Sequence, residues 1–257
     1  MAEYLSGSEE LFVQKMNSRA KELGMNDTTF KNCHGIDEDG HLTSSYDIAL
    51  MSKELLQNHP EITQYTTTWI DSLRNGQSEL VNTNKLIRTY EGATGLKTGS
   101  TSLALYNLSA SATKNDLSLI AVVLRAPTPK IRFSEAKLLL DYGFNNYNFK
   151  TLCNKGDIIK SISIEKGTDV STDLIFEDSS GVLIKKENSS EITEELLINT
   201  PISAPIKQGD ILGKINYYSN NELISSVNLI SSKTIEKISI WNMFEHISEK
   251  WLHLLKI

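Results

Sequence analysis

The sequence predicts an α+β fold: an antiparallel sheet with helices comes first, a small β-sandwich follows, and an amphipathic helix closes the chain. Three observations predict this order. Apolar side chains recur at helical spacing in residues 8–24, 44–56 and 128–143, on both sides of a strand-rich stretch. Short alternating runs separated by turn residues fill residues 157–229. A helical period returns at residues 240–257.

Capping residues predict the limits of the first two helices. Ser8 is a suitable N-cap, and the two glutamates that follow it favour the helix dipole. Gly24 can take the left-handed conformation that ends a helix, before a loop rich in Asn, Asp and Gly at 26–40. Ser44 resembles the start of a capping box, so we expect a second helix that stops before Pro60.

A three-stranded meander and a third helix are expected next. After extended or irregular chain at 65–94, the strands fall at 97–101, 106–113 and 118–124, with a tight hairpin turn at 114–116. Thr128 is a plausible N-cap with Pro129 at the first helical position, and the helical spacing runs to Gly143. The helix should therefore pack back on the sheet.

The second half of the chain predicts a separate all-β unit. Its alternating runs are residues 157–164, 170–176, 182–185, 195–198, 211–218 and 223–229. Even spacing of this kind is typical of a small β-sandwich. We therefore expect three parts, at 1–149, 150–238 and 239–257.

Composition narrows the function classes. The 257 residues are 39% hydrophobic and 23% charged with a net charge of −6, and the basic residues are scattered, so a nucleic-acid partner is not expected. Cys33 and Cys153 lie far apart and outside any CxxC spacing, which predicts neither a disulfide framework nor a zinc site. No secretory signal or membrane-spanning stretch is visible. The immediate entry into a helix suggests a sequence truncated at its N-terminus.

One acidic loop invites a metal-site interpretation. His34, Asp37, Asp39 and His41 carry ligand chemistry. Their spacing fails the calcium-loop pattern and matches no zinc motif, so ordinary Asx- and Gly-rich turn chemistry explains them better. We expect no metal.

The chemistry is indicated by Lys97-Thr98-Gly99. K-T-G is one of three motifs of the penicillin-recognising serine acyl-transfer enzymes, although a tripeptide alone also fits a plain strand start. Longer strings decide between the two interpretations: GLKTGST at 95–101, YNLSASATKND at 106–116, LIAVVLRAPT at 119–128, FSEAKLLLDYGF at 133–144, and the helical text at 12–51.

With these strings the chain resembles the serine-type D-alanyl-D-alanine carboxypeptidases, the low-molecular-mass penicillin-binding proteins. The resemblance covers nearly the whole chain. It implies that residues 1–149 are the C-terminal portion of a β-lactamase/transpeptidase-like domain. It also implies removal of the terminal D-Ala from peptidoglycan stem pentapeptides outside the cytoplasmic membrane, by serine acylation and hydrolysis without metal or organic cofactor. β-Lactam antibiotics would bind the full-length enzyme.

The resemblance implies the following substrate-binding residues: Lys97, Thr98, Gly99, Ser100, Thr101 and Arg132. Lys97 would offset substrate charge, Thr98 would donate a hydrogen bond, and Gly99 would admit close backbone approach. The Ser100 N–H would complete an oxyanion hole. Arg132 would bind the terminal carboxylate of the peptide; the alternative is a solvated arginine, although a cation is disfavoured at a helix start.

The nucleophile is expected elsewhere. The resemblance implies that S-x-x-K and S-x-N precede the text with which this chain begins. Chance matches do occur, for S-x-x-K at Ser18, Ser111, Ser134 and Ser163 and for S-x-N at Ser219 and Ser226. Each lies in a segment whose family counterpart has another role. We therefore expect this chain alone to be inactive and to form no stable penicillin adduct.

The terminal helix admits two interpretations. Its apolar face includes Trp241, Phe244, Trp251 and Leu255, which predicts an anchor at a membrane surface, whereas the alternative is a cover packed on its own domain. The resemblance favours the anchor.

Two other functions stay open. A class A β-lactamase shares K-T-G, but the trailing β-sandwich and amphipathic tail are superfluous there. A non-catalytic module that binds peptidoglycan or a partner enzyme would keep K-T-G as a ligand site.

Overall fold

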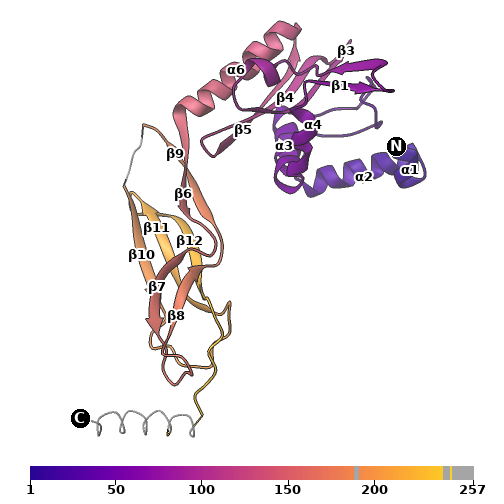
Figure 1. Cartoon of the computed structure of the whole chain (residues 1–257). Helices are drawn as coiled ribbons and strands as arrows, with labels where there is room; N and C mark the ends of the chain where they lie inside the picture. Colours follow the sequence, from indigo (N-terminus) through magenta and orange to yellow (C-terminus); the bar gives the residue numbers. More distant parts are fainter. Residues whose placement is uncertain (188–190, 240–243, 245–257) are drawn as a thin grey trace. The chain divides into compact units, whose positions relative to one another are not determined.

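The computed structural model describes residues 1–187, 191–239 and 244. The chain divides into two compact units, Met1–Tyr147 and Asn148–Ile257. Figure 1 shows helices together with strands in the first unit and an all-β arrangement in the second. Each unit is described by itself.

The first unit opens with helices whose ends follow the capping residues. The helices are α1 (Ala2–Ser6), α2 (Glu9–Glu22), α3 (Ser45–Asn58), the 3-10 turn η1 (Pro60–Ile62) and α4 (Thr63–Thr66). Ser8 Oγ accepts a hydrogen bond from Leu11 N at 3.3 Å, and Ser44 Oγ accepts one from Asp47 N at 3.2 Å. Gly24 has a φ of 77° just past α2. Both predicted N-caps and the glycine stop are confirmed.

The stretch predicted as extended or irregular chain contains short elements. A hairpin of β1 (Ile70–Leu73) and β2 (Ser78–Val81) is followed by the one-turn helix α5 (Leu86–Thr89). Seven of the eight hairpin residues are exposed, so no apolar alternation marked these strands in the sequence.

The predicted meander is confirmed as a three-stranded antiparallel sheet in the order β3-β4-β5. Its strands are β3 (Ala93–Thr101), β4 (Leu105–Lys114) and β5 (Leu117–Ala126), so β3 begins four residues earlier than expected. Asn115 and Asp116 form the predicted turn with φ values of 49° and 62°. Two left-handed residues are what a tight hairpin of matching twist requires.

One face of this sheet packs on α6 (Pro129–Asn146), as predicted. Its core includes fully buried Leu108 and Ala110 of β4 with Ala136 and Leu140 of α6. Burying a leucine of this kind stabilises the fold by roughly 1.5–3 kcal/mol. The predicted end of α6 at Gly143 was wrong. Gly143 is buried within the helix, where a Cβ would lie 2.4 Å from Leu119 Cδ1, so close packing explains the glycine.

The opposite face of the sheet packs on α3 through polar contacts as well as apolar ones. Ser52 Oγ of α3 lies 2.7 Å from Ser109 Oγ of β4, and both residues are buried. Ser52 Oγ also donates to the carbonyl oxygen of Ile48 at 2.7 Å. This satisfied hydroxyl pair ties α3 to the middle strand.

The second unit consists of strands in two sheets, and the pairs of the larger sheet are antiparallel. A five-stranded sheet has the order β10-β11-β12-β8-β7, and β6 pairs with β9. The strands are β6 (Tyr147–Cys153), β7 (Ile158–Ser163), β8 (Ser171–Phe176), β9 (Ser180–Lys185), β10 (Ile192–Ile198), β11 (Ile211–Ser219) and β12 (Glu222–Ser231). All six predicted runs form strands, whereas β6 was not predicted. The core contains Leu174, Tyr217 and Leu229 of the larger sheet with Cys153 of β6.

The predicted terminal helix falls largely outside the described part of the chain. Of its four predicted anchor residues, Trp241, Trp251 and Leu255 are not described, and Phe244 is exposed. Among the described residues, no helix combines the length and the apolar character needed to cross a lipid bilayer.

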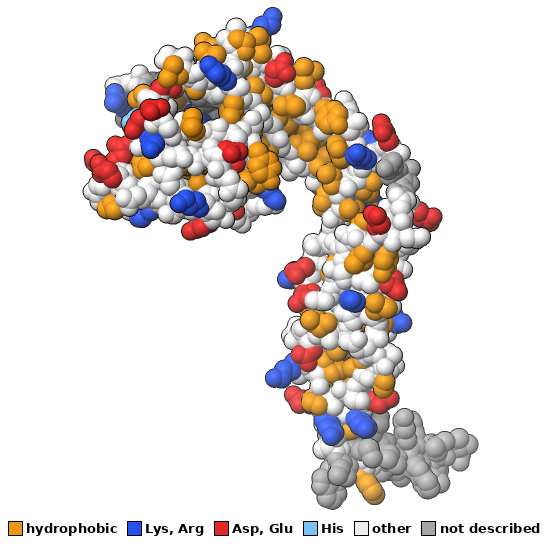
Figure 2. Space-filling view, turned by 180° about the vertical axis from the view of Figure 1, so that it is seen from behind, with side chains coloured by type: hydrophobic (Ala, Val, Ile, Leu, Met, Phe, Trp, Pro, Cys, Tyr) orange, Lys and Arg blue, Asp and Glu red, His pale blue; other side chains and the backbone are white. Residues whose placement is uncertain are grey.

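On the face shown in Figure 2, basic and acidic side chains are interspersed.

Candidate functional site

The K-T-G motif lies on the edge strand β3 of the first unit. Among the described residues β3 pairs with β4 alone, which leaves its outer edge without a strand partner. Lys97, Gly99 and Ser100 are exposed, whereas Thr98 is 8% exposed. An edge of this kind presents main-chain N–H and C=O groups to an extended peptide.

The side chains of Lys97 and Thr98 lie on opposite faces of the sheet. Lys97 is paired with Ser109, and Thr98 is paired with Leu108, which belongs to the core under α6. Because successive side chains alternate, Lys97 lies on the α3 face and Thr98 on the α6 face. The Lys97 ammonium donates to the main-chain oxygen of Thr98. The motif therefore brings a cation to one face and a hydroxyl to the other.

The Thr98 hydroxyl has a partner that sequence reasoning missed. Thr83 Oγ1 lies 2.5 Å from Thr98 Oγ1. Asn82, next to Thr83, donates through Nδ2 to the carbonyl oxygens of Thr66 and Thr68 at 3.1 and 2.9 Å. The side-chain amide of Asn82 thus fixes the loop that presents Thr83 to the K-T-G strand.

Arg132 lies behind the motif and is buried, with 7% of its surface exposed. Its Nη1 donates to the main-chain oxygen of Asn107 at 3.1 Å and to that of Gly99 at 3.4 Å. The guanidinium carbon lies 4.6 Å from the ring centre of Phe133 and 5.7 Å from that of Tyr106. Burial lowers the pKa of Arg132, but a guanidinium stays charged at neutral pH. The solvated alternative is therefore wrong.

One donor of the buried Arg132 guanidinium makes no hydrogen bond within the described residues. Its Nε has no hydrogen-bond partner among the described residues. A desolvated cation with a free donor favours binding an anion, and a carboxylate matches the planar fork of arginine. The buried charge of Arg132 lies next to the Gly99 oxygen, within the K-T-G strand.

The strand end beyond the motif is held by Asp37, which sequence reasoning had considered only as a metal ligand. Asp37 Oδ1 accepts from Thr101 Oγ1 at 2.6 Å, and Oδ2 accepts from Leu103 N at 3.2 Å and Ser102 Oγ at 3.3 Å. The Thr101 hydroxyl, followed by these other donors, holds the pKa of Asp37 below its usual range.

The other members of that loop have separate local partners. His34 Nδ1 accepts from Ile36 N at 3.2 Å, and His41 Nδ1 accepts from Lys31 N at 3.3 Å. Across the described residues, no group of three or more His, Cys, Asp or Glu side chains is arranged to hold a metal ion.

The four S-x-x-K matches lie in separate elements of the fold. Ser111 lies on β4, where a residue three positions on points to the opposite face, and its Oγ is 2.7 Å from Thr94 Oγ1. Ser134 donates to the carbonyl oxygen of Ile131 within α6. Ser18 is exposed on α2, and Ser163 ends β7 in the second unit.

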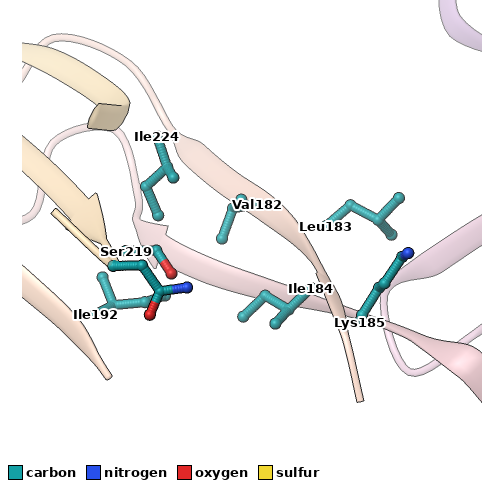
Figure 3. A pocket seen from close by; sticks show the side chains of 8 residues that line it. Val182, Leu183, Ile184, Lys185, Ile192, Ser219 and Ile224 are labelled. Atoms are coloured by element: carbon teal, nitrogen blue, oxygen red, sulfur yellow. The ribbon is translucent and has the colours of Figure 1, made fainter. Parts of the chain in front are cut away.

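A pocket of about 180 Å³ lies in the second unit, between β9, β10 and the β11–β12 turn. Figure 3 shows its mainly apolar lining, with Ile184 and Ile192 beside Lys185 and Ser219. A space of this size suits one or two apolar side chains. Lys185 is the one charged side chain among the described residues that line it.

An edge strand with Lys-Thr-Gly and an arginine behind it defines a class, the penicillin-recognising serine acyl-transfer enzymes. Comparisons with known proteins narrow that class. The family model for D-alanyl-D-alanine carboxypeptidase matches residues 1–128, and the model for the C-terminal domain of penicillin-binding protein 5 matches residues 147–237. The second match favours a carboxypeptidase over a class A β-lactamase.

Individual relatives support the same family. D-alanyl-D-alanine carboxypeptidase DacF of Bacillus subtilis is 38% identical over 98% of this chain and 65% of its own length. Penicillin-binding protein 5 from Haemophilus influenzae has 30% identity and a TM-score of 0.69, covering 92% of this chain and 69% of that one. A cefotaxime-bound penicillin-binding protein from Listeria monocytogenes has 34% identity and a TM-score of 0.52, covering 56% of this chain and 58% of that one.

The chain belongs to the D-alanyl-D-alanine carboxypeptidase family, whose members are serine-type peptidases. It spans 65% of the length of the Bacillus subtilis relative.

Proposed function

We propose that this chain carries the substrate-recognition edge of a serine-type D-Ala-D-Ala carboxypeptidase that trims peptidoglycan stem pentapeptides. One observation carries the proposal. The open edge of β3 bears Lys97 and Gly99, and the buried guanidinium of Arg132 lies 3.4 Å from the Gly99 oxygen. A free strand edge beside a desolvated cation suits an extended peptide that ends in a carboxylate.

The proposed roles follow from this placement. The peptide lies along the outer edge of β3, with its terminal carboxylate attracted by Arg132 and by the ammonium of Lys97. Gly99 has no heavy atom within 4 Å of where a Cβ would stand, so the space beside it is open for close approach. The Ser100 N–H supplies one donor of an oxyanion hole, and the Thr98 hydroxyl, shared with Thr83, donates to the substrate.

The reaction proceeds through an acyl-enzyme. A serine oxygen attacks the carbonyl of the penultimate D-Ala, D-Ala leaves with a proton, and water then cleaves the ester. The serine, its lysine base and the second serine come from S-x-x-K and S-x-N motifs outside this sequence, since the matches inside it lie in segments whose family counterparts have other roles. The chain alone is then inactive, and β-lactams acylate only the complete site.

The setting is extracytoplasmic, at the membrane surface of a bacterium. The sequence of residues 239–257, in which Trp241, Phe244, Trp251 and Leu255 recur at helical spacing, favours an interfacial anchor. A non-catalytic peptidoglycan-binding role would use the same β3 edge.

Titration of the isotope-labelled full chain with diacetyl-Lys-D-Ala-D-Ala, followed by NMR, tests the proposal. We expect saturable shifts at the amides of Gly99 and Ser100, and much weaker ones with the L-Ala-L-Ala peptide. Equal responses to the two stereoisomers, or no response to either, would refute the recognition role.

A further inference from the structure

Asp37 contacts the residues that directly follow the recognition strand, although 64 positions separate it from Thr101. Its two carboxylate oxygens accept from the hydroxyls of Thr101 and Ser102 and from the amide of Leu103. The Thr101 hydroxyl oxygen in turn accepts from Ala104 N at 3.0 Å. One ionised side chain therefore organises the whole β3–β4 turn.

The loop that carries Asp37 is itself fixed to the helices. Asn17 of α2 exchanges two hydrogen bonds with the main chain of Phe30, at 2.8 and 2.9 Å. Buried Asp47 of α3 accepts from the amide of Asp27 at 2.9 Å and from the hydroxyl of Thr28 at 2.6 Å. Within the loop, Asn32 donates to the carbonyl oxygen of Ile36 at 3.0 Å. The Asp37 carboxylate is thus held at a defined place before it contacts the turn.

The position of the turn sets the position of the recognition edge. Ser100 pairs with Tyr106 and Thr101 with Leu105, so the turn joins the last paired residues of β3 and β4. Arg132 reaches the same strand ends from the other side, through the oxygens of Gly99 and Asn107. A shift of the turn would move the Ser100 amide relative to the Arg132 guanidinium, and small displacements of such groups are costly in binding and catalysis.

We propose that Asp37 is a positioning residue for the recognition edge, the outer edge of β3 at residues 97–100. By bonding to the turn residues 101–103, Asp37 fixes the Gly99–Ser100 backbone in the geometry that receives the C-terminal end of the D-Ala-D-Ala peptide. This inference rests on the proposed function. Asp37 touches no substrate atom in this account, and it acts through Thr101 and the turn.

The test uses the isotope-labelled full chain with four variants. Asp37→Asn removes the charge and Thr101→Val removes the hydroxyl, whereas Thr101→Ser keeps the hydroxyl as a conservative rescue. Asp39→Asn is the matched control, because Asp39 is an exposed carboxylate of the same loop. The readouts are the exchange rate of the Leu103 amide, the amide shifts of Gly99 and Ser100, and the affinity for diacetyl-Lys-D-Ala-D-Ala.

We expect Asp37→Asn to accelerate Leu103 exchange about fivefold, the effect of one lost hydrogen bond of ordinary strength. Asp37→Asn and Thr101→Val should both shift Gly99 and Ser100 and weaken peptide binding about fivefold, with no change in the fold of the rest of the unit. Thr101→Ser should keep the Gly99 and Ser100 shifts of the wild type because it keeps the hydroxyl, and Asp39→Asn should match the wild type in all three readouts.

Unchanged Gly99 and Ser100 resonances in both Asp37→Asn and Thr101→Val, or equal changes in Asp39→Asn, would overturn the positioning role. If the wild type binds no D-Ala-D-Ala peptide, the proposed function fails, yet the amide data of the free protein still decide whether Asp37 fixes the edge. The two failures are therefore distinguishable.

Discussion

Arg132 is joined to Asn107 across the end of the sheet, with Nη1 3.1 Å from the main-chain oxygen of Asn107. The same nitrogen also bonds to the Gly99 oxygen, so one buried guanidinium spans β3 and β4. Its charge is fixed at the end of the K-T-G strand and shielded from water. The recognition account depends on this arrangement.

Arg132→Lys should weaken binding of a D-Ala-D-Ala peptide about tenfold. Lysine keeps the charge but loses the planar fork, and it cannot bond to two main-chain oxygens while contacting a carboxylate. Affinity from an NMR titration checks the prediction. Arg125→Lys is the control, since Arg125 is an exposed arginine of β5 and should bind like the wild type. Equal affinities for wild type and Arg132→Lys would argue against carboxylate recognition.

Gly99→Ala should separate binding from stability. No heavy atom lies within 4 Å of a Cβ built at Gly99, so the unfolding temperature should stay close to that of the wild type. The added methyl group would stand where the substrate backbone approaches, and we expect peptide affinity to fall about fivefold or more. A variant that binds normally would show that close approach at Gly99 is not needed.

Gly213→Ala, in the second unit, should lower stability, unlike Gly99→Ala. A Cβ at Gly213 would lie 2.5 Å from the main-chain oxygen of Leu197 and 3.1 Å from Ile198 Cα, neither of which can move as a side chain can. We expect a loss of about 1–3 kcal/mol in the free energy of unfolding, measured by urea denaturation. Wild-type stability in this variant would contradict the tight pairing of β10 with β11.

The lowered pKa of Asp37 makes a pH-dependent contribution to stability. Because the folded state favours the ionised form, the contribution is present above the ordinary aspartate pKa of about 3.9 and is lost as the pH falls through the lower folded value. The stability difference between wild type and Asp37→Asn should therefore shrink from about pH 7 to about pH 2. Urea midpoints across this range measure it. A difference that is constant with pH would contradict the cause assigned to the shift, and Asp39→Asn should show none.

A fluorescent penicillin should not label this chain. Covalent acylation needs an activated serine with a base in reach, and the proposed function assigns that pair to motifs outside this sequence. Gel fluorescence after incubation checks this, with a family member that contains S-x-x-K as the positive control. Stable labelling of the chain would show that one of its own serines is a nucleophile.

Local signals in the sequence predicted much of the fold. Ser8, Ser44 and Thr128 accept hydrogen bonds from the first turns of their helices, because a cap depends on residues three positions apart. The strand that bears Lys97 and the turn at Asn115 were likewise predictable from patterns within a few residues.

Features set by distant partners were not predictable. Gly143 resembles a helix end in sequence, but its contact with Leu119 on β5 keeps it inside α6. Strand β6 was missed because most of its residues are exposed and show no buried alternation. Asp37 was considered only as a ligand, since nothing near it in sequence indicates its bond to Thr101. The polar contacts between β4 and α3 could have been predicted, because Ser109 and Ser111 alternate with the apolar Leu108 and Ala110 in the sequence, and all four are buried.

Titration of the full chain with a matched pair of peptides tests the central claim most directly. Diacetyl-Lys-D-Ala-D-Ala carries the terminal carboxylate, and its carboxamide analogue differs only in the loss of that charge. If the guanidinium of Arg132 holds the carboxylate beside Gly99, the carboxamide should bind about tenfold more weakly to the wild type, and the difference should be much smaller in Arg132→Lys. Equal affinity of the wild type for the two peptides would contradict the account.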